Sequence, residues 1–430
     1  MKQLFSVTAL LLGSALLLFA GGMNALILPI RGTEEGFSAA ALGILGTGWA
    51  LGYVAGCVIT PPLVGKVGHI RAFGVMAAFA AVAVLLSLIF ITPYAWVPLR
   101  ALSGFCFAGA AMIVESWLSE RADPGSRGRI FGLYTMVNLV ASTAGQMVLT
   151  LGDASGFLFF VLPAIFYCLA LVPTAVSSTA VPKPLVSVRL DLRALWRNSP
   201  VAVFGVLCVG ISNSAFGTLA AVYADRVGLA VSSVALFASL PVLAGALSQV
   251  PIGYLSDRMD RRKVLVAVAA TALAVDLLFI LAPIQDVIAL LALSAAFGGA
   301  IYAMYPIIIA HANDHAPEGT AIQVSGGLLM VFGIGSIAGP AFAGFAMTGL
   351  GEWGLFLTSA GAHVLLILFA IVRIAARAPV EAEDKASFVP APSARALTPE
   401  TVALAVGEEA ETGDLAAPEA APQAGDSNLR

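Results

Sequence analysis

Long apolar runs, separated by short polar connections, fill most of the chain. A run of about 20 apolar residues is long enough to cross the hydrocarbon core of a bilayer as an α-helix. The pattern therefore predicts an all-α membrane protein. Twelve transmembrane helices are expected, at residues 5–30, 38–60, 72–92, 96–119, 129–151, 156–176, 200–224, 230–252, 263–283, 287–311, 320–348 and 353–375.

The first run also has features of a secretory signal peptide, because Lys2 precedes an apolar stretch that ends in small residues. A signal core holds roughly 7–15 apolar residues, whereas this run continues through Leu26 to Ile30. We therefore expect it to be a retained first helix.

The composition places the protein in lipid. Of the 430 residues, 59% are hydrophobic and 11% are Asp, Glu, Lys or Arg, whereas about 25% of a soluble domain is charged. The net charge of −3 and the lack of a basic stripe argue against nucleic acid as a partner. The four cysteines lie in apolar runs without metal-ligand spacing, and the chain has no P-loop, HExxH or Gly-x-Ser-x-Gly motif. We expect no enzyme activity, metal or cofactor.

Basic residues predict the orientation. In the arrangement of twelve helices, Lys and Arg gather on one side, and the opposite side holds only Arg31 and Arg226. Cytoplasmic connections of membrane proteins carry the excess of basic residues. Both termini and the polar linker at 177–199 are therefore expected in the cytoplasm, with the protein in the plasma (inner) membrane.

The two halves of the chain repeat each other. Gly36 and Gly228 align at an offset of 192 residues, which also places residues 61–71 on 253–263, and STAG (142–145) matches SIAG (336–339) at an offset of 194. Such a repeat is typical of secondary transporters, in which two similar bundles surround a central path. We expect bundles at 1–176 and 200–377, the linker at 177–199, and at 378–430 a disordered, solvated tail without a role.

Two motifs resemble those of a known family. GYLSDRMDRRK (253–263) resembles the signature loop of the major facilitator superfamily, which joins the second and third helices of each half, and RALSG (100–104) resembles a motif of the fourth helix. Within the superfamily, MIVESWL (112–118), RGR (127–129) and MYPIIIAHA (304–312) are similar to the YcaD-type branch. The resemblance implies two six-helix bundles and no known substrate.

Polar residues inside the predicted helices are candidates for the solute site. Ionisable groups are costly in lipid, so each is a functional candidate. The resemblance places Arg100 in a central cavity, where it would hold an anionic group or tune a nearby acid; alternatively, it bonds carbonyls of a neighbouring helix. The further cavity candidates are Gly104 and Phe107 on the face of Arg100, Tyr134, and the amides Asn24, Asn138, Gln146, Asn213 and Gln249, which could equally join helices to each other.

Two buried carboxyl groups are candidates for proton coupling or for an inner polar network. Glu115 would either carry a proton or pair with Arg127 or Arg129 in the next connection. Asp276 lies deep in a helix that the resemblance makes peripheral, so a buried partner or a neutral acid fits it better than a solute contact.

The signature loop is expected to form a cytoplasmic gate, as a turn two residues wide that stops two helices. The resemblance implies that Asp257 lies against the start of the helix at 129–151, while Arg261 and Arg262 pair with acids at helix ends. In the first-half copy, Gly65 replaces the aspartate, and Lys66 and Arg71 would face Glu318. Alternatively, the cluster enforces topology only. The full set of expected gate residues is Gly253, Asp257, Arg258, Arg261, Arg262, Lys66, Arg71, Glu120, Arg127, Arg129 and Glu318.

Taken with the resemblance, these features predict a secondary active transporter of a small organic solute. It would work as a monomer, by alternating access through rocking of the two bundles, with protons as the coupling ion. The alternatives are a multidrug or metabolite exporter, and a membrane sensor or assembly partner with the shape of a transporter.

Overall fold

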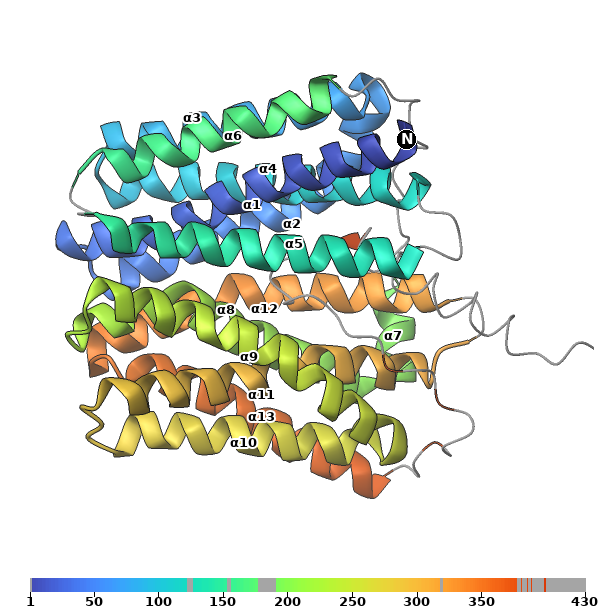
Figure 1. Ribbon diagram of the computed structural model, residues 1–430. Coiled ribbons are helices and arrows are strands. Elements are labelled where there is room, and N and C mark those ends of the chain that lie inside the picture. The colour runs from blue at the N-terminus through green and yellow to red at the C-terminus, as the bar shows by residue number, and fades with distance from the viewer. Residues whose placement is uncertain are drawn as a thin grey trace, which may run out of the picture.

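A computed structural model describes residues 2–121, 127–152, 156–176, 191–317 and 320–376, with residues 380, 385, 388, 398 and 399 of the tail. The side chains of residues 2–7, 119–121, 127–129, 131 and 322 lie outside this description. All regular elements in the described part are helices (Figure 1), as expected for a chain that must satisfy its backbone hydrogen bonds within lipid.

The described helices fall into two groups that follow each other along the chain. The first group is α1 (Lys2–Glu34), α2 (Ala39–Val67), α3 (His69–Ile89), α4 (Pro93–Arg121), α5 (Arg127–Val148), the 3-10 turn η2 (Leu149–Leu151) and α6 (Leu158–Val176). The second group is α8 (Pro200–Arg226), α9 (Val231–Arg258), α10 (Arg261–Leu281), α11 (Val287–Asn313), α12 (Ala321–Leu350) and α13 (Gly354–Ala376). A short helix, α7 (Leu192–Asn198), lies between the groups.

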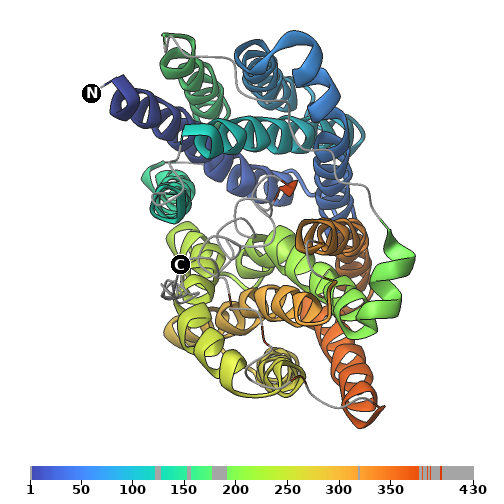
Figure 2. The same cartoon turned by 90° about the vertical axis from the view of Figure 1, so that its right-hand side faces the viewer.

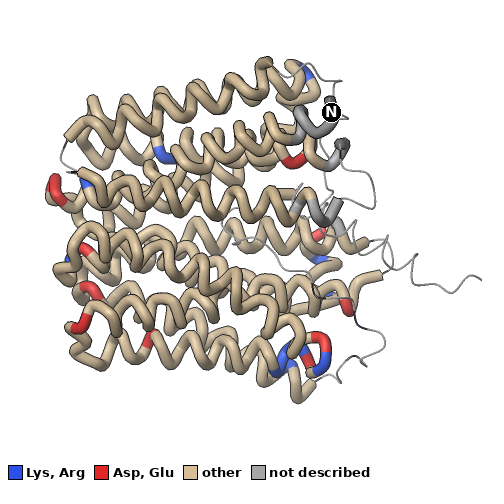
Figure 3. The backbone as a smooth tube through the Cα atoms, in the orientation of Figure 1, with Lys and Arg blue, Asp and Glu red and all other residues tan. Residues whose placement is uncertain are grey.

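Each of the twelve predicted spans coincides with a long helix. Within the described residues, 11 helices are long and apolar enough to cross a membrane, and α5 runs alongside them. Charged residues gather toward the two ends of the helices (Figure 3), and the middle parts of the helices are largely uncharged. The protein is therefore a multi-pass integral membrane protein.

Two details differ from the sequence expectations. Helix α2 continues to Val67 and α9 to Arg258, past the predicted ends at 60 and 252, because the polar ends of a membrane helix can extend beyond the lipid. The connection between α9 and α10 is Met259 and Asp260, which is the turn of two residues that was expected. Helix α7 was not predicted; the Asp191 side chain caps it by accepting from the Ala194 amide at 2.9 Å.

The internal repeat is visible in how the helices pack. A Cβ atom on Gly145 would overlap the carbonyl oxygen of Phe19, where α5 crosses α1. A Cβ atom on Gly339 would overlap the carbonyl oxygen of Ile211 in the same way, where α12 crosses α8. Phe19 and Ile211 are 192 positions apart, which is the offset of the sequence repeat. Glycine is thus required at equivalent crossings in both halves.

The two halves touch at one end of the molecule. We call this the far end; it is where α1 ends and α2 begins, and the near end is the opposite end, where the N-terminus lies (Figure 1). At the far end, Thr47 Oγ1 donates to the carbonyl of Ile337 at 2.7 Å, and the amide of Ala40 donates to Thr348 Oγ1 at 2.9 Å. The contact therefore joins the first part of α2 to the last part of α12.

Candidate functional site

Helix α4 carries both ionisable residues that were predicted for the first half. Arg100 and Glu115 are 8% and 1% exposed. Fifteen residues of α-helix separate them by roughly 22 Å, so they belong to two polar clusters. Gly104 lies between them, and a Cβ atom there would overlap the Trp49 carbonyl of α2. The close crossing of α2 and α4 therefore accounts for this glycine.

The first cluster surrounds Arg100 and lies closer to the far end. Tyr167 of α6 interacts electrostatically with Arg100 and is hydrogen-bonded to the Asn24 side chain of α1. Asn24 is buried, and its Oδ1 has no hydrogen-bond partner among the described residues. An unsatisfied buried acceptor costs free energy, so this oxygen is suited to receive a donor from a solute. Three helices thus contribute to the cluster.

An aromatic group adjoins the Arg100 cluster. The ring of Phe107 lies 5.9 Å from that of Trp49 and 6.3 Å from that of Tyr53. A Cβ atom on Gly21 would lie 3.3 Å from Phe107 and 3.9 Å from the Tyr167 hydroxyl. Trp49, Tyr53 and Tyr167 were not predicted. Their helices are apolar on every side, so the sequence pattern carries no signal for the direction in which these side chains point.

The second cluster surrounds Glu115. The Tyr134 hydroxyl donates to Glu115 Oε1 at 3.1 Å. Tyr134 is also hydrogen-bonded to Asn138, whose Oδ1 accepts from Ser14 Oγ at 2.8 Å. The network therefore joins α4, α5 and α1. The alternative partners of Glu115, Arg127 and Arg129, lie outside the described side chains, so a pair with them stays a prediction.

Three further predicted amides lie on other helices; Asn213 and Gln249 are buried, and Gln146 is partly buried. Gln146 lies on α5, and its Oε1 has no partner among the described residues. Neither polar atom of the Asn213 side chain on α8 has one. Gln249 on α9 is buried as well. Asn213 and Gln146 thus present unused hydrogen-bonding capacity inside the protein, which a polar ligand or water could satisfy.

Asp276 has a buried partner, one of its two predicted alternatives. Its Oδ2 lies 2.7 Å from His363 Nδ1, and its Oδ1 accepts from Ser359 Oγ at 2.5 Å. The other ring nitrogen of His363 lies 3.0 Å from Ser212 Oγ. This network joins α10, α13 and α8, so its members all come from the second half, whereas the Glu115 network lies in the first.

The expected gate residues of the second half form a dense set of ion pairs at the near end. Arg261 is 1% exposed; its Nε donates to Asp314 Oδ2 at 2.7 Å, and its Nη1 to Asp257 Oδ1 at 3.0 Å. Arg262 Nη2 donates to Asp260 Oδ2 at 2.8 Å. All these partners belong to the second half, so the network ties α9, α10 and α11 into one unit.

The Asp260 carboxylate lies in the connection before α10. Partial burial favours a raised pKa, but the hydrogen bonds and charge of Arg262 outweigh it, and the pKa of Asp260 lies below its usual value. A lowered pKa means that the pair contributes stability above the ordinary aspartate pKa of about 3.9. This contribution is lost only as the pH falls through the lowered value.

The remaining expected gate residues are less connected. Arg258 lies over the ring of Tyr254, 3.8 Å from its centroid. Lys66 and Arg71 are exposed, and neither forms an ion pair with a carboxylate in the part of the chain that the structure describes. Their expected partner Glu318 lies outside the described residues, as do the side chains of Glu120, Arg127 and Arg129.

The first-half connection is built differently from the second. His69 is the counterpart of Arg261 at the offset of 192. It is buried and stacks on Trp117, with ring centroids 5.8 Å apart and an interplanar angle of 25°. Ser116 Oγ lies 3.5 Å from its Nε2. An aromatic stack therefore occupies the place where the second half has a buried ion pair.

Comparisons with known proteins agree on one family. A family model described as Major Facilitator Superfamily matches residues 10–245 and 202–407. Curated relatives include a protein of Salmonella arizonae, 25% identical over 87% of this chain and 97% of its own length, and one of Shigella flexneri, 26% identical over the same shares. Both are named as uncharacterized MFS-type transporter YcaD.

Solved structures show the same fold. The nucleoside transporter NupG gives a TM-score of 0.72 at 16% identity, covering 85% of this chain and 98% of its own. A bacterial homologue of the human lysosomal transporter Spinster, in an inward-facing and occupied conformation, gives a TM-score of 0.67 at 16% identity. That match covers 88% of this chain and 97% of the homologue.

Proposed function

Because the chain belongs to the major facilitator superfamily of transporters, we propose that it is a secondary active transporter of a small organic solute, coupled to protons. The observation that carries the proposal is the way in which the polar networks divide. Arg261 and Asp314 pair within the second half, as do Asp276 and His363, whereas Glu115 and Tyr134 bond within the first. Each half can therefore move as a unit about the far-end contact, which is the motion that alternating access by rocking requires.

The orientation proposed from the basic residues places the near end in the cytoplasm, with the protein in the plasma (inner) membrane. The direct contact of α2 with α12 then closes the outer side. In this arrangement the protein faces inward.

The Arg100 cluster is proposed as the solute site. It combines a guanidinium donor with the Tyr167 hydroxyl and the unpaired Asn24 oxygen. The Trp49 and Phe107 rings beside it supply apolar surface. Such a site suits an organic molecule that has one anionic or strongly polar group and one flat or apolar part. Glu115, buried between this cluster and the near end, is proposed to carry the coupling proton.

Uptake into proteoliposomes tests the function. We expect one class of labelled solute, from a panel of organic acids, amino acids, sugars and nucleosides, to accumulate inside. Accumulation should be faster with a proton gradient directed along the transport direction than without one. No flux for any member of the panel would contradict the proposed transport. Equal rates of solute accumulation with and without the proton gradient would contradict only the proton coupling.

A further inference from the structure

Described residues of the C-terminal tail contact the helices at the near end. The short red piece in Figure 2, which belongs to the tail, lies between the two halves of the molecule. Lys385, Phe388 and Thr398 make contacts there with α9 and α4. Described tail residues therefore contact both halves at the near end.

Two tail residues hold the end of α9. Lys385 Nζ donates to the carbonyl of Met259 at 2.6 Å, and Met259 is the residue that caps the C-terminus of α9. A positive charge is favourable at such a helix end. Phe388 packs on Gly253, where a Cβ atom would overlap its ring. The signature glycine thus provides space for the tail.

Thr398 lies deeper, on the first half. It is 0% exposed, and its hydroxyl donates to Glu115 Oε2. The other oxygen of this carboxylate accepts from Tyr134. A carboxylate with a hydroxyl donor on each oxygen is well satisfied in a buried place, and it would lose free energy if either donor left without a replacement.

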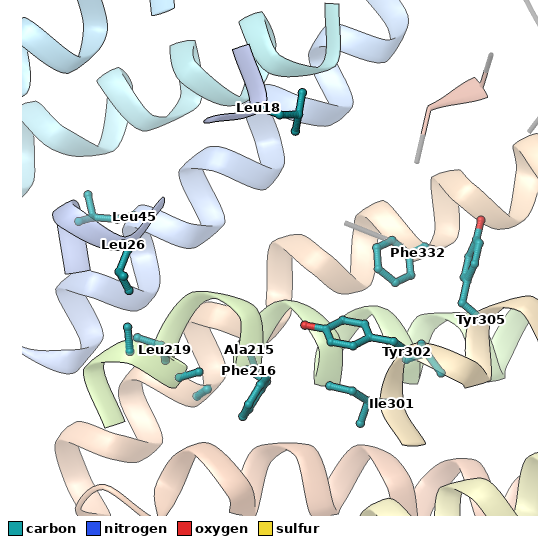
Figure 4. Packing of buried hydrophobic residues seen from close by; sticks show 14 of the residues in the cluster. Leu18, Leu26, Leu45, Ala215, Phe216, Leu219, Ile301, Tyr302, Tyr305 and Phe332 are labelled. Atoms are coloured by element: carbon teal, nitrogen blue, oxygen red, sulfur yellow. The ribbon is translucent and has the colours of Figure 1, made fainter. Parts of the chain in front are cut away.

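The second half contributes a further hydroxyl to this region. Tyr305 of α11 interacts electrostatically with Tyr53, as does Glu115. Tyr305 is fully buried, and its hydroxyl has no hydrogen-bond partner among the described residues. In Figure 4 this hydroxyl points out of the second half, toward the side where Leu18 of α1 lies. Tyr305 is thus available to a ligand that lies between the halves.

We propose that Glu115, Tyr134 and Tyr305 form a binding site for hydroxyl groups between the halves, separate from the Arg100 cluster, and that Thr398 fills it in this structure. The threonine side chain, a small alcohol, stands in for an alcohol group of the transported solute. The solute is accordingly a hydroxylated organic molecule, an assignment that rests on the proposed transport function. Because one oxygen of Glu115 can accept either hydroxyl, the tail and the solute compete for the site.

A matched pair of tail variants tests occupancy without any transport measurement. Cys57 of α2 interacts electrostatically with Glu115, so it reports on access to the site once Cys106, Cys168 and Cys208 are replaced with alanine. Thr398→Val keeps the shape of the side chain without the hydroxyl, and Thr398→Ser keeps the hydroxyl. The full chain would be labelled in inside-out vesicles with a membrane-impermeant maleimide.

We expect Cys57 to be labelled about tenfold faster in Thr398→Val than in the chain with Thr398. This is the effect of losing one hydrogen bond to a charged group. Thr398→Ser should label at nearly the wild-type rate. Equal rates for the valine and serine variants would overturn the claim that the Thr398 hydroxyl holds the tail in the site.

The same reporter tests the ligand class. Uridine, ribose and xylitol serve as hydroxylated probes, and hydroxyl-free 1-methyluracil is the control. At least one hydroxylated probe should slow the labelling of Cys57 in Thr398→Val, where the tail no longer competes, and 1-methyluracil should not. The absence of protection by all three hydroxylated probes, or equal protection by 1-methyluracil, would overturn the hydroxyl-binding assignment. If a hydroxylated probe protects Cys57 but no solute is taken up by proteoliposomes, the binding site is supported and the proposed transport is contradicted.

Discussion

Replacing Arg100 with alanine is expected to lower the transport rate by about 100-fold or more, with the protein still folded in the membrane. Truncating one member of a buried, hydrogen-bonded charge interaction costs about 2–5 kcal/mol. Arg100 is 8% exposed, and it interacts electrostatically with Tyr167. The loss should fall on solute binding and transport, because Arg100 supplies the positive charge of the proposed solute site.

Arg100→Lys is the matched variant for this prediction. It retains the charge but loses the planar fork of donors that fits carboxylates. We expect a rate between those of the wild type and Arg100→Ala if the fork contacts the solute. Thermal unfolding in detergent would verify that both variants are folded. Near-normal uptake by a folded Arg100→Ala variant would contradict the assignment of the solute site to this cluster.

The second large effect is expected at the near end of the second half. Arg261→Ala should destabilise the protein by about 3–5 kcal/mol, the typical cost of breaking a buried ion pair. The reason is that Asp314, whose side chain is 2% exposed, would remain a buried charge after losing its ion pair with Arg261. The midpoint of thermal unfolding in detergent measures the change.

Asp257→Asn is the control, since it removes the other carboxylate that Arg261 contacts. The Asp257 side chain is 44% exposed, and exposed pairs contribute about 0–1 kcal/mol. Its midpoint should therefore stay close to that of the wild type. Equal losses in Asp257→Asn and Arg261→Ala would show that burial of the pair with Asp314 is not what stabilises this connection.

Much of the fold could be predicted because lipid restricts what a chain can do. A run of about 20 apolar residues has to form a helix there, and this rule placed the twelve long helices in the described part of the chain. The repeat could also be predicted, since Gly145 and Gly339 occur in matching STAG and SIAG sequences. Helix crossings at these glycines then follow from their lack of a side chain.

The candidate site was harder to predict, because polar partners come from helices far apart in sequence. Glu115 and Asp276 were recognised from their cost in lipid, but Tyr134, His363 and Ser359 were assigned to them only by the structure. Tyr167 was missed altogether. The composition of the tail contains no indication that Thr398 would contact Glu115, since one threonine in a polar segment has no distinguishing pattern.

Locking the far end tests the central claim, that the two halves rock about this contact during transport. The Ala40 amide donates there to Thr348 Oγ1 at 2.9 Å, so Ala40→Cys and Thr348→Cys place a cysteine pair at this contact, to be oxidised to a disulfide in a background without native cysteines. The uptake rate of the oxidised double variant is compared with that of the same protein after reduction. Each single variant, treated with the same oxidant, serves as a control. We predict no transport in the oxidised state and full recovery on reduction. Equal transport rates before and after reduction, with the disulfide verified, would contradict alternating access by rocking of the two halves.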